Sequence, residues 1–322
     1  MAGEIQKVAV IGGGVIGGGW AARCLLRGID VTVHDPDPAV ERKVNTVIDN
    51  AVHAYERLGL MTVERGSLSF TVDLCDAVRS ADFVQENTPE NEAIKKTVLA
   101  SIAANSRPDT IIASSTSGLL PSRLQTDCLN PERIVVGHPF NPVYLLPLVE
   151  ICGGALTSAD IVARAADFYR SLGMRPLLVR KEIDGFVADR LMEALWREAL
   201  HLVNDGIATT ADIDDAIIYG AGMRWAFMGP FLTFWLAGGE GGMRHFMKQF
   251  GPALQLPWTK LQAPELTDDL LERIVEQSDE QTEGQDVRAL ERQRDECLIA
   301  IMEGLAPQEI AAGNVLNEQR QN

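Results

Sequence analysis

The chain has 322 residues, of which 46% are hydrophobic and 23% are charged, a composition typical of globular proteins with two or three domains. This composition excludes a disordered acidic tail protein and is sufficient for a buried core. Acidic residues outnumber basic ones, 45 to 29, which gives a formal net charge of −16. Phosphate backbones and anionic lipid surfaces bind clustered Lys and Arg, so we expect neither nucleic acid nor a membrane as a partner.

The five cysteines stand at positions 24, 75, 128, 152 and 297, and no two have C-x-x-C spacing. This pattern argues against a disulfide scaffold and against a thiolate metal site, so we expect no bound metal. Unpaired thiols are typical of a reducing compartment. The chain also lacks an apolar run of about 20 residues and the N-terminal pattern of a secretory leader. We therefore expect a cytoplasmic protein.

Short β-branched runs alternate with helical patterns in the first half of the chain. Strands are predicted at 5–11, 30–34, 67–72, 82–85, 110–113, 133–137 and 145–151, with helices at 15–28, 37–59 and 91–104 between them. This alternation predicts a parallel sheet with crossover helices.

After residue 158 the pattern becomes mainly helical. A helix at 158–172 and a last strand at 175–180 precede predicted helices at 186–204, 210–219, 230–237, 241–250, 267–279 and 286–304. Asp184-Gly185 separates the last strand from a long amphipathic helix, so we place the domain boundary there, giving domains 1–184 and 185–322. We expect the polar tail after residue 306 to fray.

A glycine-rich turn directly follows the first predicted strand. Gly12, Gly14 and Gly17 fit the pattern G-x-G-x-x-G, with Val15 and Ile16 between the last two glycines. The first glycine permits a tight turn, the second lets the main chain approach a pyrophosphate, and the third lets the helix pack on the strand. The helix N-terminus then offers free N–H groups to the phosphates. The sequence therefore predicts an α/β protein, with an N-terminal doubly wound Rossmann sheet that binds a dinucleotide, followed by an all-α domain.

Asp35 ends the second predicted strand, 18 residues after Gly17. A carboxylate at this distance accepts hydrogen bonds from the ribose hydroxyls and repels a 2′-phosphate, which favours NAD over NADP. The alternative is that Asp35 only begins the turn Asp35–Pro38. Flavins use the same glycine pattern, so the loop by itself does not define the chemistry.

His138 ends another predicted strand, at the sheet edge where open α/β folds bind ligands. Oxidation of an alcohol by a nicotinamide requires removal of the hydroxyl proton, and histidine, which titrates near neutral pH, suits that step. Glu150 lies 12 residues later, where a carboxylate could fix the imidazole tautomer and stabilise the imidazolium. A lone histidine and a lone glutamate can also be structural, so these two residues alone leave both interpretations open.

Several short motifs occur together in this chain. His138 opens His-Pro-Phe-Asn-Pro, residues 81–86 read Ala-Asp-Phe-Val-Gln-Glu, Pro89-Glu90-Asn91 begins a helix, residues 114–117 read Ser-Ser-Thr-Ser, and residues 184–190 read Asp-Gly-Phe-Val-Ala-Asp-Arg. In this order, and with Glu150 12 residues after the histidine, the chain resembles the 3-hydroxyacyl-CoA dehydrogenase family over residues 5–240.

The resemblance implies NAD-dependent oxidation of a 3-hydroxyl group. Carried over residue by residue, it implies His138 as the catalytic base and Glu150 as its partner. It also implies that Ser117 and Asn141 act at the substrate hydroxyl or near the nicotinamide.

Glu90 and Lys95 match positions that line the family's cofactor site. Two departures from the family pattern are Ser115, which replaces an asparagine, and Asp189, which replaces an asparagine that helps to hold the substrate near the histidine. An extra carboxylate suits a cationic substrate better than an anionic thioester. Residues 53–65 also lack the Lys-rich helix expected to bind coenzyme A phosphates, and the net charge opposes so anionic a ligand. We therefore do not expect coenzyme A.

Residues 220–251 hold seven aromatic side chains in 32 positions, in a chain that is 6% aromatic. This segment resembles members of the family that oxidise L-carnitine, which implies L-carnitine as the small-molecule substrate and 3-dehydrocarnitine as the product. A trimethylammonium group has no N–H to donate and binds to aromatic faces with carboxylates nearby. The candidate substrate contacts are Phe140, Asp189, Arg190, Arg224, Trp225, Trp235, Phe246 and Phe250. Either arginine could bind the substrate carboxylate, and any one aromatic could instead belong to a core or a dimer seam.

The apolar helices after residue 186 exceed what one small domain covers, so we expect a homodimer. Two further activities stay open, oxidation of L-gulonate at its 3-hydroxyl and oxidation of an L-3-hydroxyacyl-CoA. A non-enzymatic alternative is a dinucleotide-binding structural or sensor protein. The presence of both His138 and Glu150 argues against that last alternative, because binding alone needs neither residue.

Overall fold

The computed structural model describes residues 5–61, 63–260 and 287–321, together with residues 262, 265, 267–270, 272, 273 and 277. The chain divides into two compact units. Unit 1 comprises Met1–Asp189, Asp295–Glu303 and Val315–Asn322, and unit 2 comprises Arg190–Arg294 and Gly304–Asn314. None of the described helices is both long enough and apolar enough to span a bilayer.

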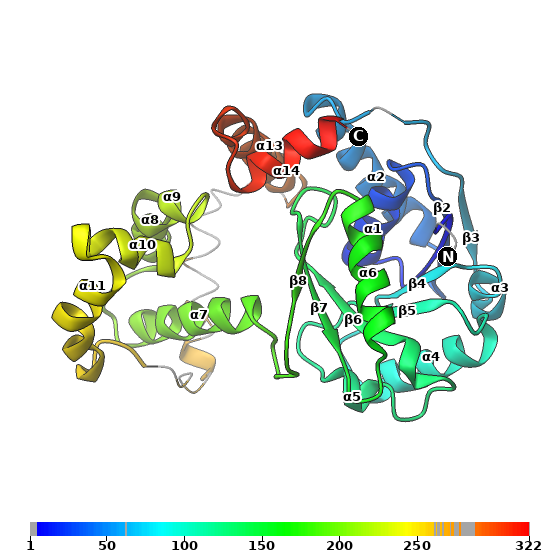
Figure 1. Cartoon of the computed structure of the whole chain (residues 1–322), viewed down its shortest axis with the longest axis horizontal. Helices are drawn as coiled ribbons and strands as arrows, with labels where there is room; N and C mark the ends of the chain where they lie inside the picture. The colour runs from blue at the N-terminus through cyan, green and yellow to red at the C-terminus, as the bar shows by residue number, and fades with distance from the viewer. Residues whose placement is uncertain are drawn as a thin grey trace. The chain divides into compact units, whose positions relative to one another are not determined.

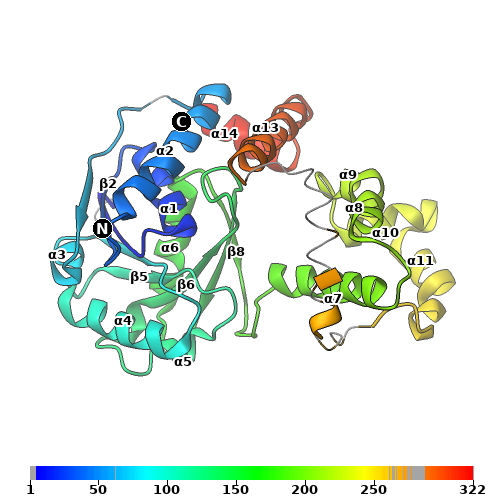
Figure 2. The same cartoon turned by 180° about the vertical axis from the view of Figure 1, so that it is seen from behind.

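Among the described residues, an eight-stranded sheet forms the centre of unit 1, in the order β3-β2-β1-β4-β5-β6-β7-β8 (Figures 1 and 2). The strands are β1 (Lys7–Ile11), β2 (Asp30–His34), β3 (Leu68–Thr71), β4 (Phe83–Glu86), β5 (Ile111–Ser114), β6 (Ile134–Pro139), β7 (Leu148–Gly153) and β8 (Arg175–Leu178). The strand order reverses between β1 and β4, which is the switch point at which doubly wound sheets bind ligands. The predicted fold class is therefore confirmed.

One strand pair departs from the predicted parallel sheet. β6 and β7 run antiparallel, with His138 opposite Glu150, whereas β5–β6 and β7–β8 are parallel pairs. Only residues 140–147 connect β6 to β7, and a parallel crossover needs a dozen or more residues. The prediction of a parallel sheet is therefore wrong at this pair.

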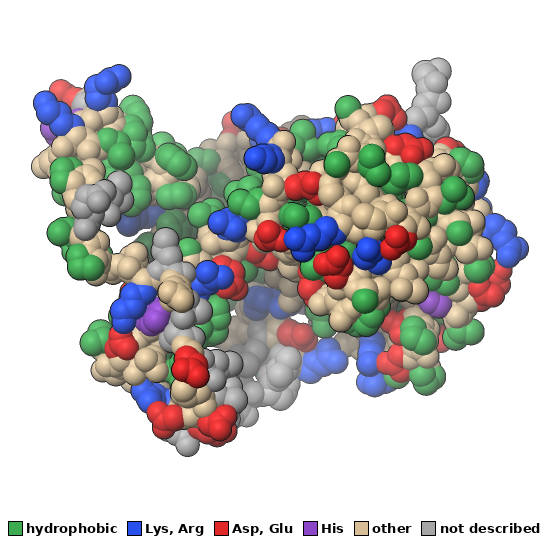
Figure 3. Space-filling model, turned by 90° about the horizontal axis from the view of Figure 1, so that it is seen from below, with side chains coloured by type: hydrophobic (Ala, Val, Ile, Leu, Met, Phe, Trp, Pro, Cys, Tyr) green, Lys and Arg blue, Asp and Glu red, His purple; other side chains and the backbone are tan. Residues whose placement is uncertain are grey.

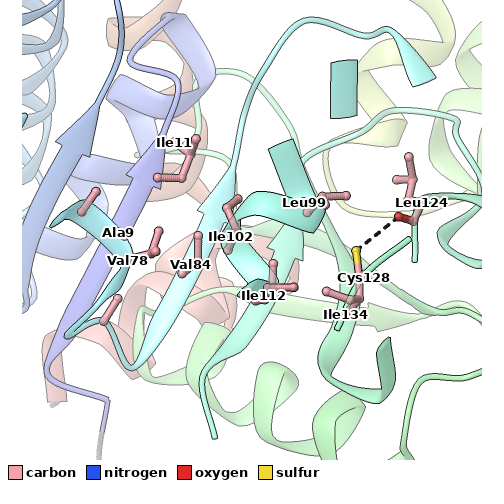
Figure 4. Close-up of a cluster of buried hydrophobic side chains, with 13 residues drawn as sticks. Ala9, Ile11, Val78, Val84, Leu99, Ile102, Ile112, Leu124, Cys128 and Ile134 are labelled. Atoms are coloured by element: carbon pink, nitrogen blue, oxygen red, sulfur yellow. Dashed lines mark hydrogen bonds between the residues drawn. The ribbon is translucent and has the colours of Figure 1, made fainter. Parts of the chain in front are cut away.

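Helices cover both faces of the sheet. α1 (Val15–Leu25), α2 (Val40–Arg57) and α6 (Ala159–Ser171) lie on one face, and α3 (Leu74–Val78), α4 (Glu92–Asn105) and α5 (Pro121–Leu124) lie on the other. On the first face, the rings of Trp20 and Tyr169 lie 5.2 Å apart between centroids, and Tyr169 packs edge-on against Phe83. On the second face, Val84 packs with Ile102 in a cluster of buried aliphatic side chains (Figure 4). Phe83 and Val84 are adjacent in β4, so they point to opposite faces.

Unit 2 is helical among its described residues. α7 (Ala188–Asn204) continues from unit 1 into unit 2 and is followed by α8 (Thr210–Ala216), η2 (Ile217–Ala221), α9 (Gly222–Trp225), α10 (Pro230–Ala237), η3 (Gly239–Gly241), α11 (Gly242–Phe250) and η4 (Gly251–Gln255). These elements confirm the predicted helical second domain. Of the helix predicted at 267–279, residues 268–270, 272, 273 and 277 are helical, and residues 271, 274–276, 278 and 279 lie outside the described residues.

The C-terminal segment forms α13 (Val287–Leu305), η5 (Ala306–Gln308) and α14 (Ala311–Gln321). The expectation that this tail frays is wrong, because Val315 and Leu316 are buried. Arg320 Nε also donates to the carbonyl of Leu58, after α2, at 2.8 Å. The adjacent apolar residues Val315 and Leu316 thus give this otherwise polar helix a buried part, which belongs to unit 1.

Gly137 passes directly against the ring of Tyr169. A Cβ at Gly137 would lie 1.9 Å from the Tyr169 hydroxyl oxygen, and that buried hydroxyl donates to Gln85 Oε1 at 2.7 Å. We expect Gly137→Ala to destabilise the protein by about 1–3 kcal/mol, because the ring cannot move aside without losing this bond. Thermal unfolding of the full chain measures the effect as a lower midpoint. Gly304→Ala is the control, since its Cβ would meet nothing within 4 Å. Equal midpoints for Gly137→Ala and the unmodified protein would contradict this account.

Candidate active site

His138 and Glu150 face each other across the antiparallel strands β6 and β7. They occupy paired positions, so their side chains project from the same face of the sheet. His138 Nδ1 lies 3.0 Å from Glu150 Oε2. The histidine side chain is 5% exposed and the glutamate side chain is fully buried. The 12-residue spacing in the sequence therefore reflects the register of two antiparallel strands.

The second carboxylate oxygen of Glu150 is bound by main-chain N–H groups. Val187 N and Ala188 N each donate to Oε1 at 2.9 Å, at the start of α7, where the helix dipole favours a negative charge. Burial alone would raise the pKa of Glu150, but the hydrogen bonds from His138, Ala188 and Val187 together hold that pKa below its ordinary value. An ionised Glu150 accepts the Nδ1–H of His138, which leaves Nε2 as the nitrogen that can accept a proton.

Aromatic and apolar groups enclose the imidazole of His138. The rings of Phe140 and Phe186 lie 4.8 Å and 5.9 Å from it between centroids. Phe186 is buried and packs with Cys152. Burial raises the pKa of the Cys152 thiol to about 12, so this thiol stays protonated and acts as an apolar neighbour. Gly185 and Phe186 both have positive φ, 73° and 45°, and this turn carries the following N–H groups to the carboxylate.

A second carboxylate faces the other nitrogen of the imidazole. Asp189 Oδ2 lies 3.7 Å from His138 Nε2, and the Asp189 side chain is 21% exposed. Asp189 stands in the first turn of α7. The structure therefore brings together the predicted base, its predicted partner and two predicted substrate contacts, Phe140 and Asp189.

Ser117 and Asn141 are exposed residues that follow β5 and β6, at the C-terminal edge of these parallel strands. Glu90 Oε1 accepts hydrogen bonds from Ser117 N at 3.1 Å and from Gly118 N at 3.3 Å, which fixes the loop after β5. Gly185 N in turn donates to the carbonyl of Gly118 at 3.4 Å. The loop that carries Ser117 thus lies beside the turn that holds Glu150. Direct contacts of Ser117 and Asn141 with a substrate stay predictions.

The glycine loop has the packing that its sequence predicts. Gly12 has a φ of 95°, and a Cβ there would lie 2.7 Å from the carbonyl oxygen of Asn87. A Cβ at Gly17 would lie 1.8 Å from the carbonyl oxygen of Gly12. Gly14 is exposed, has nothing within 4 Å of its Cβ position, and carries no side-chain cap for α1. The loop therefore offers the room and the uncapped N–H groups that a dinucleotide pyrophosphate requires, so these residues fit NAD.

Asp35 follows β2 and binds two main-chain N–H groups. Oδ2 accepts from Gly13 N at 2.7 Å, and Oδ1 accepts from Asp37 N at 2.8 Å. The carboxylate therefore does begin the turn Asp35–Pro38, as the alternative interpretation of Asp35 predicted. It also connects that turn to the glycine loop through its bond to Gly13 N. Each oxygen keeps a lone pair for a ribose hydroxyl, and the role of Asp35 toward ribose stays a prediction.

A buried ion pair, absent from the predicted site residues as a pair, supports the loop after β4. Lys95 Nζ lies 3.0 Å from Glu86 Oε1 and 2.9 Å from the carbonyl of Thr88, and both charged side chains are at most 1% exposed. Ser114 Oγ also donates to Glu86 Oε2 at 2.5 Å. Lys95 lies 3.6 Å from Glu90, so it holds the carboxylate that fixes the next loop. A glutamate at the end of an apolar strand, with a lysine nine residues later, could have indicated this pair.

A polar network explains the serine at position 115. Ser115 Oγ accepts from Trp20 Nε1 at 3.0 Å and from Gln85 Nε2 at 2.8 Å. Gln85 Nε2 also donates to the carbonyl of Gly137 at 3.2 Å, and its Oε1 accepts from the Tyr169 hydroxyl. The network thus connects α1 and α6 to the main chain of β6 directly before the histidine.

The remaining predicted substrate contacts lie in unit 2: Arg190, Arg224, Trp225, Trp235, Phe246 and Phe250. Both arginines are exposed, and Trp225, Trp235 and Phe250 are about half exposed. Phe246 stacks between Phe234 and Phe250, with centroid distances of 4.8 Å and 5.1 Å. The contacts of these residues with a substrate stay predictions.

Two family models together match residues 7–281 except residue 184. The NAD binding domain of 3-hydroxyacyl-CoA dehydrogenase matches residues 7–183, and the C-terminal domain of 3-hydroxyacyl-CoA dehydrogenase matches residues 185–281.

Individual relatives agree with the family models. An L-carnitine dehydrogenase from Pseudomonas putida is 55% identical over 311 residues, which cover 96% of this chain and 97% of the relative. One from Burkholderia mallei is 56% identical and covers 94% and 95%. Among solved structures, 5-formyl-3-hydroxy-2-methylpyridine 4-carboxylic acid 5-dehydrogenase, an NAD+ dependent dismutase, is 31% identical with a TM-score of 0.80, over 94% of this chain and 99% of that one. The chain therefore belongs to the 3-hydroxyacyl-CoA dehydrogenase family and is an NAD-dependent 3-hydroxy acid dehydrogenase.

Proposed function

We propose that this enzyme oxidises the 3-hydroxyl of L-carnitine to 3-dehydrocarnitine. The observation that carries the proposal is a set of relatives named L-carnitine dehydrogenase, which are 52–56% identical over 93–98% of this chain. The chemistry of the site supports the proposal, because removal of a hydroxyl proton requires a base, and Glu150 orients the imidazole of His138 for that role.

The reaction converts a secondary alcohol into a ketone, with loss of one hydride and one proton. NAD, when bound, supplies the acceptor of the hydride. His138 Nε2 accepts the hydroxyl proton, and Glu150, which binds Nδ1–H, stabilises the imidazolium that results. Ser117 and Asn141 position the hydroxyl and the nicotinamide at the C-terminal edge of the sheet. Gly12, Gly14, Val15, Ile16, Gly17, Asp35 and Glu90 form the cofactor site, with Lys95 beneath it.

A cationic substrate suits the charges and rings of this chain. Asp189 places a carboxylate beside the reacting nitrogen of His138. Exposed aromatic rings of unit 2, among them Trp225, Trp235 and Phe250, offer faces that bind a trimethylammonium group. An exposed arginine, Arg190 or Arg224, then binds the substrate carboxylate.

The enzyme is proposed to act as a homodimer. On α7 the apolar side chains of Leu191, Met192, Leu195 and Trp196 are 43–61% exposed, at the spacing of one helix face. Hydrophobic side chains are exposed on unit 2 more generally (Figure 3). Apolar surface of this extent marks a protein interface, and a second copy of the chain is the simplest partner. The five cysteines are all free thiols, which supports a reducing compartment such as the cytoplasm.

Cofactor choice tests the role of Asp35. We expect the enzyme to prefer NAD strongly over NADP, and Asp35→Ala to weaken NAD binding and narrow that preference, because the ribose hydroxyls lose their acceptor. Titrations of both cofactors measure this. Asp35→Asn is the matched variant, since its amide oxygen keeps one acceptor for Gly13 N while the charge is lost. Equal use of NAD and NADP by the unmodified enzyme would refute the assignment.

Steady-state kinetics test the dyad. We expect His138→Gln to lower kcat by about 10²–10⁴, the usual contribution of a general base. Glu150→Gln should lower kcat with NAD affinity nearly intact, and the double variant should be little worse than the poorer single variant, because the two groups act as a unit. Oxidation should be faster at alkaline pH. The low pKa of Glu150 keeps its carboxylate charged there, while the imidazole must start neutral. Near-normal turnover by His138→Gln would remove it from the mechanism.

An uncharged isostere tests the substrate. A tert-butyl analogue of carnitine should bind at least about tenfold more weakly than carnitine, because shape is kept while cation–π and carboxylate attraction are lost. NADH formation with L-carnitine, L-gulonate and 3-hydroxybutyryl-CoA compares the alternatives directly. Phe250→Ala should raise KM for carnitine and spare NAD, and Phe250→Leu should recover packing without recovering affinity for the cation. If the isostere bound equally and L-gulonate were the better substrate, the carnitine proposal would fail.

A further inference from the structure

The imidazole of His138 has a carboxylate near each of its two nitrogens. Nδ1 lies 3.0 Å from Glu150 Oε2, and Nε2 lies 3.7 Å from Asp189 Oδ2. We propose that Asp189 is a second carboxylate partner of His138, which stabilises the imidazolium formed when the substrate hydroxyl gives up its proton. This inference rests on the proposed role of His138 as the base, and it assigns to Asp189 a part in proton transfer as well as in substrate binding.

The distance and the burial decide the nature of this interaction. At 3.7 Å the two atoms are too far apart for a hydrogen bond, so Asp189 acts through its charge once the imidazole is protonated. The imidazole is 5% exposed and Asp189 is 21% exposed, so solvent screens the pair only partly. An opposite charge at this range favours the charged form of a titrating group. Asp189 therefore favours the protonated imidazole.

One short segment sets both carboxylates in place. The N–H groups of Val187 and Ala188 bind Glu150, and the next residue is Asp189 in the first turn of α7. The buried ring of Phe186 fixes the start of this segment against the imidazole. The position of Asp189 thus follows from the same contacts that hold Glu150.

The rings and the thiol that pack around the imidazole carry no charge. Phe140 and Phe186 are neutral rings, and the Cys152 thiol on β7 stays protonated. Glu182, which lies near Cys152, is occupied by Ser122, whose N and Oγ donate to its two oxygens. Within the described part of unit 1, the charged groups at ion-pair distance from the imidazole are therefore Glu150 and Asp189.

The first test is the pH dependence of kcat in both directions, with the full-length enzyme and its nicotinamide cofactor. Asp189→Asn removes the charge and keeps the shape. Oxidation needs the neutral imidazole, so the acidic limb of the pH profile of kcat for oxidation should move to lower pH by about one unit. Reduction needs the imidazolium, so the basic limb of the pH profile of kcat for reduction should also move to lower pH by about one unit. At a pH above that limb, kcat for reduction should therefore fall about tenfold.

Two further variants separate charge from helix structure. Asp189→Glu keeps the carboxylate and should keep both limbs near their original pH. Asp160→Asn makes the same change of net charge on α6, where the side chain is 75% exposed on the opposite face of the sheet, and should move neither limb. If Asp189 served only the first turn of α7, Asp189→Asn would lower rates or stability with both limbs unmoved, and that result would overturn the proposal.

The second test needs no substrate. NMR titration of the His138 imidazole, assigned with His138→Gln, should give a midpoint about one pH unit lower in Asp189→Asn and unchanged in Asp160→Asn. If Asp189→Asn does not fold, Asp189→Ser removes the charge and keeps a hydroxyl suited to a helix N-terminus. An unmoved midpoint in a folded variant overturns the proposal. A moved midpoint in an enzyme that does not oxidise L-carnitine supports this inference and rejects the substrate, so the two failures are distinguishable.

Discussion

The buried carboxylate of Glu150 is the constraint on which the site depends. A carboxylate buried away from solvent is tolerated in a folded protein only where hydrogen bonds replace those of water. Here His138 and two main-chain N–H groups supply them. Those bonds require the register in which β6 pairs antiparallel with β7, and they require α7 to begin at Ala188. They also fix the imidazole tautomer, so the geometry of the base follows from the need to satisfy one buried group.

A second buried charge pair has the same effect beside the cofactor loop. Glu86 and Lys95 form an ion pair, and Ser114 and Thr88 donate further hydrogen bonds to the Glu86 carboxylate. These contacts fix the loop after β4, which leads to Glu90, a second partner of Lys95. Polar groups held this way move little, so the loops at the C-terminal edge of the sheet are shaped before any ligand arrives. Such preorganisation is worth most where charge develops during a reaction, as it does on the imidazole.

Local patterns carried the predictions that proved correct. Each strand and most helices have their own periodicity, and the glycine turn has its own spacing, so both could be predicted without knowledge of distant contacts. The packing of α14 depends on partners far along the chain, such as Leu58 for Arg320. The antiparallel pairing of β6 and β7 and the burial of Lys95 involve residues close in sequence, but they depend on how those residues meet in the folded sheet, which local periodicity does not predict. The family models meet at residue 184, whereas Asp295–Glu303 and Val315–Asn322 belong to unit 1, so the boundary after Asp184 stays a prediction.

The segment 184–190 links the chemistry to the choice of substrate. Its glycine and positive-φ turn aim two N–H groups at Glu150, and its aspartate sets a charge 3.7 Å from the reacting nitrogen. An amide at position 189 could bind a substrate but could not change the charge of the site. A carboxylate there makes the resting site more negative, which attracts a cation and repels an anionic thioester, and it favours the imidazolium once the proton has moved. In this proposal the carboxylate of Asp189 thus couples substrate selection to proton transfer, because the cationic substrate and the imidazolium both respond to its negative charge.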